Sequence, residues 1–249
     1  MILTCDIGNT RIKAGIFEDN KLTEVFVCER VSEIIEKISL HHISEVAISS
    51  VVPSNSKELE NSLYNIGIHP FIISKDSEFN LGIDYNSPDT LGMDRLCSAE
   101  GAYFLNNKKR VLKKHHIIIS IDFGTATTIN VVTYPGVFSG GLIAPGIDLM
   151  FRSLSKDTAQ LPLAYQNDYK DLIGKSTRES IASGVMNSTA GLLHWTLKRI
   201  NEELEPDKVY IYVTGGNYEP IKPFLGFTHA YKEALVLYGV NAIYDKNKL

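Results

Sequence analysis

The chain has 249 residues and a formal net charge of −4, with 44% hydrophobic and 22% charged residues. These values are typical of a globular protein with one large domain or two modest ones, and they give no electrostatic basis for nucleic acid or anionic membranes as partners. There is no run of about 18 apolar residues and no basic leader, so we expect no membrane span, no signal peptide and a cytoplasmic location. The three cysteines are too few and too unpatterned for a disulfide framework.

The first part of the chain is predicted to form three strands followed by alternating helices and strands. Strands are expected up to Asp6 and over residues 11–17, 22–28, 46–52 and 70–74. Helices are expected over residues 31–38 and from an N-cap at Ser54 through Tyr64. Residues 75–90 combine turn formers with weak periodicity, so we expect a loop there.

The middle of the chain is predicted to hold a packed helix and then a buried strand. Residues 96–105 are small and apolar, and Asp94 and Arg95 precede them at the start of the helix. A carboxylate is favoured there by the helix dipole, and its commonest role is that of a cap. The β-branched run over residues 117–121 is too short for a membrane span and predicts a buried strand that ends at Asp122.

The remainder of the chain is predicted to alternate strands with helices again. Strands are expected over residues 131–134 and 209–213, and helices from near residue 146, over 177–203 and over 231–243, before a frayed tail at 246–249. Gly140 and Gly141 are expected to form a bend. On the long helix Thr177 suits the N-cap, and Gly184 and Gly191 predict close packing within the domain or at a dimer seam.

One short motif occurs twice. Asp122 is followed by Phe-Gly-Thr-Ala-Thr-Thr, and at the N-terminus a strand runs into Asp6-Ile-Gly and then Asn-Thr. In each copy a carboxylate ends a strand, a glycine lets the backbone approach a ligand closely, and polar donors that can bind phosphate follow. An Asx turn is the usual explanation of one such motif, whereas two copies at the ends of two strong strands indicate a nucleotide bound between duplicated halves.

The paired turns resemble those of the actin, sugar-kinase and Hsp70-type ATPases. That resemblance implies an α/β fold of two ribonuclease H-like halves, each with a mixed five-stranded sheet flanked by helices. We expect residues 1–115 to form the first half, with the first phosphate turn, and residues 116–249 to form the second, with the other turn and a Thr-Gly-Gly segment under the adenosine.

Three motifs in order resemble those of the type III pantothenate kinases. They are Asp-x-Gly-Asn-Thr from Asp6, Tyr-x-x-Pro-x-x-Leu-Gly-x-Asp-Arg from Tyr85, and Asp-x-Gly-Thr-Ala-x-Thr from Asp122. A Gly-Gly-x-Ile-x-Pro-Gly run from Gly140 is similar as well. The resemblance covers nearly the whole chain and implies an ATP-dependent kinase that phosphorylates the primary hydroxyl of pantothenate, giving 4′-phosphopantothenate in the first step towards coenzyme A.

The resemblance also implies the site residues. In the family, the Gly-x-Asp-Arg element holds pantothenate and its aspartate, here Asp94, is proposed as the base. The implied substrate-binding residues are Tyr85, Gly92, Met93, Asp94, Arg95 and Thr177. The implied ATP-binding residues are Asp6, Ile7, Gly8, Asn9, Thr10, Arg11, Ile12, Lys13 and Thr125.

Cations and a second subunit are implied in the same way. Asp122 would hold a monovalent cation, K⁺ or NH₄⁺, and Mg²⁺ would lie near Asp6 with the phosphates of ATP. Thr177 matches a family threonine that reaches the neighbouring subunit's site. We therefore expect a homodimer with its active site near the subunit interface.

Other kinds of protein are partly excluded by what the motifs contain. Gly174-Lys-Ser-Thr177 imitates the end of a P-loop, but Tyr169 stands where that motif needs a glycine and no strand precedes it. No zinc-ligand spacing is present. A nucleotide-binding regulator of the same superfold would need neither Asp94 nor Arg95, so their presence favours an enzyme. A phosphatase, which activates water in place of an alcohol, stays open on the sequence alone.

Overall fold

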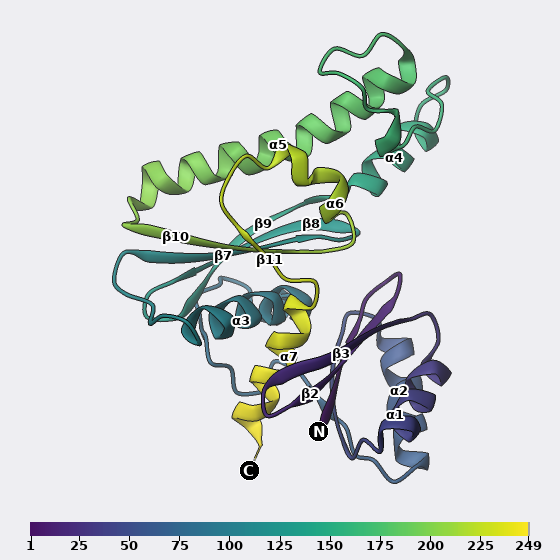
Figure 1. Ribbon diagram of the computed structural model, residues 1–249, viewed down its shortest axis with the longest axis vertical. Helices are drawn as coiled ribbons and strands as arrows, with labels where there is room; N and C mark the ends of the chain where they lie inside the picture. The colour runs from purple at the N-terminus through teal and green to yellow at the C-terminus, as the bar shows by residue number, and fades with distance from the viewer. Residues whose placement is uncertain (249) are drawn as a thin grey trace.

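The structure is a computed structural model that describes residues 1–248. Its first sheet has five strands in the order β3-β2-β1-β4-β5, and β1 pairs antiparallel with β2 and parallel with β4. The strands are β1 (Ile2–Ile7), β2 (Ile12–Glu18), β3 (Lys21–Cys28), β4 (Glu45–Ser50) and β5 (Phe71–Ile72). Helices α1 (Val31–His41) and α2 (Pro53–Asn65) cover one face of this sheet, and α7 (Leu235–Asn247) packs on the other (Figure 1).

The second sheet has six strands in the order β11-β10-β7-β8-β9-β6. They are β6 (Gly82–Ile83), β7 (His116–Phe123), β8 (Ala126–Thr133), β9 (Val137–Pro145), β10 (Lys208–Thr214) and β11 (Ala230–Tyr231). Helix α3 (Met93–Asn107) covers one face, and the other carries α4 (Ile147–Lys156), α5 (Thr177–Leu204) and α6 (Tyr218–Ile221) (Figure 1). The side chains of β7 alternate between the two cores, with Ile117, Ile119 and Ile121 towards α5 and Ile118 towards α3.

The two sheets repeat one topology, which confirms the predicted duplication. The order β9-β8-β7-β10-β11 matches β3-β2-β1-β4-β5 strand for strand. The sixth strand, β6, comes from residues 82–83, a region expected to be loop, and pairs in parallel with the edge of β9. Helices α3 and α7 pack on each other between the sheets (Figure 1). The division of the chain at residue 115 stays a prediction.

The contact between α3 and α7 depends on two glycines. A Cβ added at Gly239 would lie 1.8 Å from the carbonyl oxygen of Cys97, and one added at Gly101 would lie 2.1 Å from that of Leu235. No other residue type fits at such distances, so the backbones of the two helices touch directly. This contact fixes where the first turn of α3 lies relative to the first sheet.

Several element boundaries differ from the sequence prediction. Ser54 is not the N-cap of α2, because Pro53 is its first residue and Val52 holds the cap position. Gly140 and Gly141, expected to form a bend, lie within β9, where both have positive φ. Helix α7 begins at Leu235, later than predicted, since the chain just before it is used for β11.

The ends of α5 and α7 also differ from the sequence prediction. Helix α5 is capped by the hydroxyl of Ser176, which accepts the Glu179 N–H, and Thr177 is only its first residue. Residue 247, expected to fray, is the last residue of α7, and its side chain bonds the backbone of Glu78. The last residue of the predicted tail, Leu249, lies outside the described residues.

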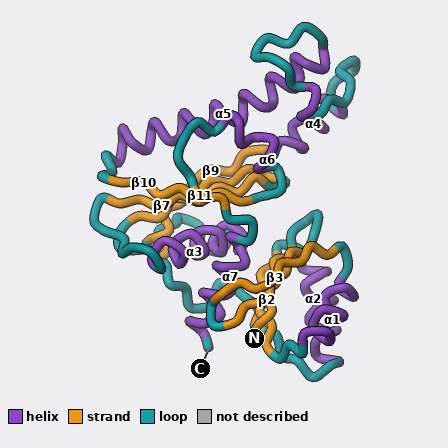
Figure 2. The backbone as a smooth tube through the Cα atoms, in the orientation of Figure 1, coloured by secondary structure: helices purple, strands orange, loops and turns teal. Residues whose placement is uncertain are grey.

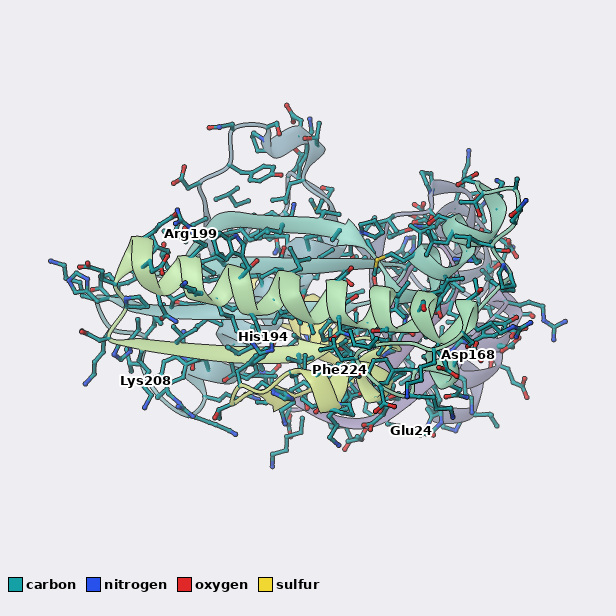
Figure 3. All side chains as sticks on the ribbon, turned by 90° about the horizontal axis from the view of Figure 1, so that it is seen from above. Glu24, Asp168, His194, Arg199, Lys208 and Phe224 are labelled. Atoms are coloured by element: carbon teal, nitrogen blue, oxygen red, sulfur yellow. The ribbon has the colours of Figure 1, made fainter. Side chains whose placement is uncertain are left out.

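Helix α5 is the longest element and runs across the outer face of the second sheet. In Figure 3 it lies in front of the sheet, with Arg199 near one end and Asp168 near the other. Between these ends His194 Nε2 lies 3.0 Å from the carbonyl oxygen of Phe224. The connection from α4 to α5, residues 157–176, loops out beyond the end of the sheet (Figure 2). None of the helices in residues 1–248 is long and apolar enough to cross a lipid bilayer.

Candidate active site

The two predicted phosphate turns face each other. Asp6 lies near the carboxyl end of β1 and Asp122 near that of β7. Because side chains alternate along a strand, Asp6 is on the α7 face of its sheet and Asp122 on the α3 face of the other, so both point into the space between the halves. Beyond them the hydroxyls of Thr10 and Thr125 approach to 3.3 Å. The structure therefore brings the two turns together.

Like charges gather at this place. Burial, together with the neighbouring carboxylates of Asp122 and Asp94, raises the pKa of Asp6 to about 7 against the opposing effect of the Lys13 ammonium. Burial also raises the pKa of Asp122 to about 6, against the effect of the Lys13 ammonium and with a further contribution from Asp94. Three carboxylates thus share one region with a single nearby ammonium, an arrangement that favours the binding of cations.

The carboxylates alone do not form a metal cage. Within residues 1–248 no group of three or more His, Cys, Asp or Glu side chains is arranged to hold a metal ion. A Mg²⁺ ion commonly takes one or two carboxylates and completes its octahedron with phosphate oxygens and water. The acidic pair at the strand ends fits that use, with the remaining ligands supplied by a nucleotide.

A third turn, after β10, closes the site beside Asp122. Gly215 has a φ of +104°, and a Cβ there would lie 2.6 Å from Asp122 Oδ1 and 2.4 Å from the Phe123 nitrogen. Further along, the carbonyl oxygen of Glu233 accepts hydrogen bonds from Lys13 Nζ at 2.9 Å and from the Thr214 hydroxyl at 3.0 Å. Lys13 of the first half is therefore tied to the second half.

Asp94 lies in the first turn of α3 without capping it. The cap position belongs to Gly92, which has no side chain, and Asp94 Oδ1 accepts the N–H of Arg95 at 2.8 Å. A Cβ at Gly92 would approach Asp94 Oδ1 to 2.5 Å, so glycine leaves the room that the carboxylate needs. Asp94 therefore does not hold the N-cap position itself, although its carboxylate accepts one N–H of the first turn.

Arg95 is nearly enclosed. Its side chain donates from Nε to Asn130 Oδ1 at 2.8 Å and from Nη1 to the Tyr85 hydroxyl at 3.4 Å. The guanidinium carbon lies 5.8 Å from the ring centre of Tyr85 and 5.6 Å from that of Phe138. Its Nη2 is buried without a hydrogen-bond partner among the described residues. A buried charged donor left unpaired is costly, so this atom is suited to an acceptor from a ligand.

A polar hollow of about 510 Å³ adjoins Tyr85. Its lining residues are Asp84, Tyr85, Asn86, Ser87, Ser139 and Gly140. Gly140 lies where β9 bulges away from β8, and a Cβ there would lie 3.7 Å from the Tyr85 ring. The hollow has the size of a small-molecule site, and Tyr85, which lines it, is also a hydrogen-bond partner of Arg95.

Not every predicted residue joins this site. Thr177 lines a separate hollow of about 500 Å³ between α4 and α5, and α5 lies on the opposite face of the second sheet from α3 (Figure 1). Apart from the backbone of α5 itself, no atom of residues 1–248 lies within 4 Å of a Cβ added at Gly184 or Gly191, so the predicted close approach does not occur among these residues. Ile7 and Ile12 are buried in the core of the first half, which leaves only their backbone groups for a ligand.

Three residues around Arg95 were not expected from the sequence: Asn130, Ser120 and Phe138. Asn130 and Ser120 are opposite each other in the β7–β8 register, and both are buried. A polar pair at positions otherwise occupied by β-branched residues was the available signal. Only the register of the strands reveals that this pair lies under Arg95.

Comparison with solved structures identifies the fold. Component A of the (R)-2-hydroxyglutaryl-CoA dehydratase from Acidaminococcus fermentans aligns over 98% of this chain and 96% of its own, with a TM-score of 0.53 and 13% identity. A glucokinase from an Antarctic psychrotroph aligns over 98% of both chains, with a TM-score of 0.52 and 11% identity. The fold is that of the actin-like ATPases and sugar kinases.

Sequence comparison then gives the family. The model of the type III pantothenate kinase family matches residues 2–199. A type III pantothenate kinase from Thermomicrobium roseum is 30% identical, covering 99% of this chain and 97% of the relative, and one from Legionella pneumophila is 32% identical, covering 87% and 88%. The chain belongs to the type III pantothenate kinase family.

Proposed function

We propose that this protein transfers the γ-phosphate of ATP to the primary hydroxyl of pantothenate, giving 4′-phosphopantothenate. The observation that carries the proposal is the position of Asp94 and Arg95, which occupy the first turn of α3 beside two phosphate turns that meet at Thr10 and Thr125. Phosphoryl transfer depends chiefly on positioning and charge neutralisation. A site that joins phosphate donors to a carboxylate and a guanidinium supplies both.

The nucleotide side is formed by the turn from Asp6 to Lys13 together with Thr125. Backbone N–H groups and hydroxyls of the two turns would hold the phosphates, with Lys13 adding a positive charge. Mg²⁺ beside Asp6 would supply neutralisation of the developing phosphate charge, and a monovalent cation at Asp122 would lower the repulsion among the carboxylates. Asp6 and Asp122 would hold these ions as carboxylates, and cation binding would favour that charged form.

The acceptor side is formed by the Gly-x-Asp-Arg turn and Tyr85. Asp94 would accept the proton of the substrate hydroxyl as that oxygen attacks phosphorus. Arg95 would offer its unpaired Nη2 to the pantothenate carboxylate, with Tyr85 and Gly140 lining the approach. Gly92 is the N-cap of α3 and Met93 its first residue, so these two residues set where Asp94 and Arg95 lie.

We also propose a homodimer. Thr177 faces a mainly apolar hollow on α4 and α5, and Gly184, which lines it, is open to close approach by another chain. A second copy seated there would bring its own site towards Thr177, as expected from the family resemblance. A cytoplasmic location is proposed as well, since Cys5, Cys28 and Cys97 are all buried and unpaired, as is usual in a reducing compartment.

The deciding experiment measures phosphorylation directly. Purified protein with ATP and Mg²⁺ is given pantothenate, pantetheine or glucose, in K⁺ buffer and in Na⁺ buffer, and products are identified by mass. We expect phosphopantothenate as the main product and a higher rate in K⁺. ADP release at the same rate without any acceptor would instead indicate a phosphohydrolase, and equal rates in K⁺ and Na⁺ would remove the monovalent cation from the proposal.

A further inference from the structure

The guanidinium of Arg95 is held by a short chain of buried polar side chains. Arg95 Nε donates to Asn130 Oδ1 at 2.8 Å, and Asn130 Nδ2 donates to the Ser120 hydroxyl at 3.2 Å. The exposed fractions are 5% for Arg95, 0% for Asn130 and 1% for Ser120. Asn130 and Ser120 come from the second sheet, whereas Arg95 comes from α3, so the chain of bonds joins two separate elements.

The orientation of the Asn130 amide follows from these contacts. Arginine side chains have no acceptor, so the atom facing Arg95 Nε has to be the amide oxygen. The amide nitrogen then faces Ser120, whose hydroxyl can accept. Ser120 therefore anchors the amide nitrogen of Asn130, and the amide oxygen of Asn130 fixes the position of Arg95 Nε.

The plane of the guanidinium decides where the free donor points. With Nε fixed by Asn130 and the aromatic rings of Tyr85 and Phe138 beside the guanidinium, the guanidinium has little freedom to rotate. Its buried, unpaired Nη2 is left as the donor for a ligand. No carboxylate of the protein forms a salt bridge with Arg95 within residues 1–248, so the side chain keeps its full positive charge for an anionic group.

We infer that Asn130 is a positioning residue that aims Arg95 at the carboxylate of the substrate and thereby sets the preference for an anionic acceptor. The inference rests on the proposed function and extends it to the choice among acceptors. A neutral amide is suited to this task because it accepts from Nε without cancelling the charge of the guanidinium. A carboxylate in its place would pair with Arg95 and compete with the substrate.

The test compares pantothenate with its alcohol analogue, in which a hydroxymethyl group replaces the carboxylate. The ratio of kcat/KM for the two acceptors is measured for the wild type and for Asn130→Leu, which keeps a similar volume but offers no acceptor. We expect the wild type to prefer pantothenate by about tenfold or more, as a charge-assisted hydrogen bond allows. In Asn130→Leu this preference is expected to fall to within about twofold of unity, through a higher KM for pantothenate, while KM for ATP stays unchanged.

Two further variants separate positioning from general packing. Asn130→Asp keeps the acceptor and the volume, and we expect it to weaken the preference for pantothenate over the alcohol analogue by neutralising Arg95. This variant also provides the test if Asn130→Leu does not fold. Ser98→Ala is the matched control, because the Ser98 hydroxyl is buried on α3 and has no hydrogen-bond partner in the described part of the chain. Its preference should equal that of the wild type.

The outcomes are distinct. If the wild type phosphorylates pantothenate but both Asn130 variants keep its full preference for the anionic acceptor, the inference is overturned and Asn130 is only a satisfied core amide. A wild type that does not distinguish the two acceptors overturns it as well. If the wild type phosphorylates neither, the proposed function itself has failed.

Discussion

At the scale of single residues, Asp94 is the group on which the proposed chemistry depends. Asp94→Asn changes one atom and leaves the start of α3 intact, since Gly92 and not Asp94 holds the cap position. We expect turnover of pantothenate to fall by about 10²- to 10⁴-fold, as on removal of a general base, with nucleotide affinity nearly unchanged. Steady-state kinetics together with calorimetric titration of ATP measure both. Turnover within a few-fold of the wild type would show that the carboxylate is not the base.

Asp6 predicts how the ligand-free protein responds to pH. Its pKa is about 7 in the folded state against about 3.8 in an unfolded chain, so between these values the unfolded state loses a proton that the folded state keeps. The free energy of unfolding therefore falls as pH rises from about 4 to 7 and is constant above pH 7 as far as Asp6 is concerned. The raised pKa of Asp122 lowers the free energy of unfolding with rising pH in the same way.

Asp6→Asn should flatten this dependence. We expect the ligand-free variant to be more stable than the wild type at pH 8 by about 1–3 kcal/mol and close to it at pH 4.5. Urea unfolding at both pH values measures the difference, and loss of ATP binding by the same variant would accompany it. Parallel stability curves for the two proteins would contradict the assigned origin of the shift.

At the scale of elements, the direct contact of α3 with α7 is the most exacting packing in the chain. Gly239→Ala would place a methyl group 1.8 Å from the Cys97 carbonyl oxygen, so the helices must separate. We expect a loss of about 2–3 kcal/mol in the free energy of unfolding. The matched control is Gly191→Ala on α5, where the added group meets no atom and helix propensity improves by up to about 1 kcal/mol. Equal stability of both variants would mean that the contact is loose.

Elements with strong local patterns were predictable, and those set by distant partners were not. The strand ending at Asp122 follows from its β-branched run, and α3 from its small apolar residues. Strand β6 has only two residues and forms because the edge of β9 accepts it, which no local pattern reveals. Gly140 and Gly141 predicted a bend because glycine weakens strands, yet Gly141 pairs with Asn130 of β8 and Gly140 lies in the bulge beside it, so β9 continues through both.

The same limit applies to the site. The aspartates of the turns and the Asp94–Arg95 pair could be named from motifs, because each motif is local in sequence. Asn130 lies 35 positions from Arg95 and meets it only through strand register. The N-cap of α5 was missed by one position, since Ser176 and Thr177 both have the required hydroxyl.

At the scale of the whole molecule, the proposed dimer is the main prediction. Light scattering should give about twice the chain mass of 27.7 kDa. Ser188→Arg puts a charge into the hollow that Thr177 lines, and we expect it to yield monomers with pantothenate turnover reduced at least about tenfold. Asn201→Arg, exposed near the other end of α5, is the control and should stay dimeric. A fully active wild-type monomer would rule out a shared site.

The chain passes between the two sheets twice, once from β5 to β6 and once from β11 to α7. These two connections form a two-point hinge. We therefore expect the two sheets to move relative to each other by rotation about the line that joins the connections. The second connection contains Glu233, whose carbonyl oxygen accepts a hydrogen bond from Lys13. Rotation of the two sheets would therefore displace Lys13 in the first phosphate turn. ADP release would then require the same rotation that admits ATP. The stiffness of the two connections would therefore limit how fast the enzyme turns over.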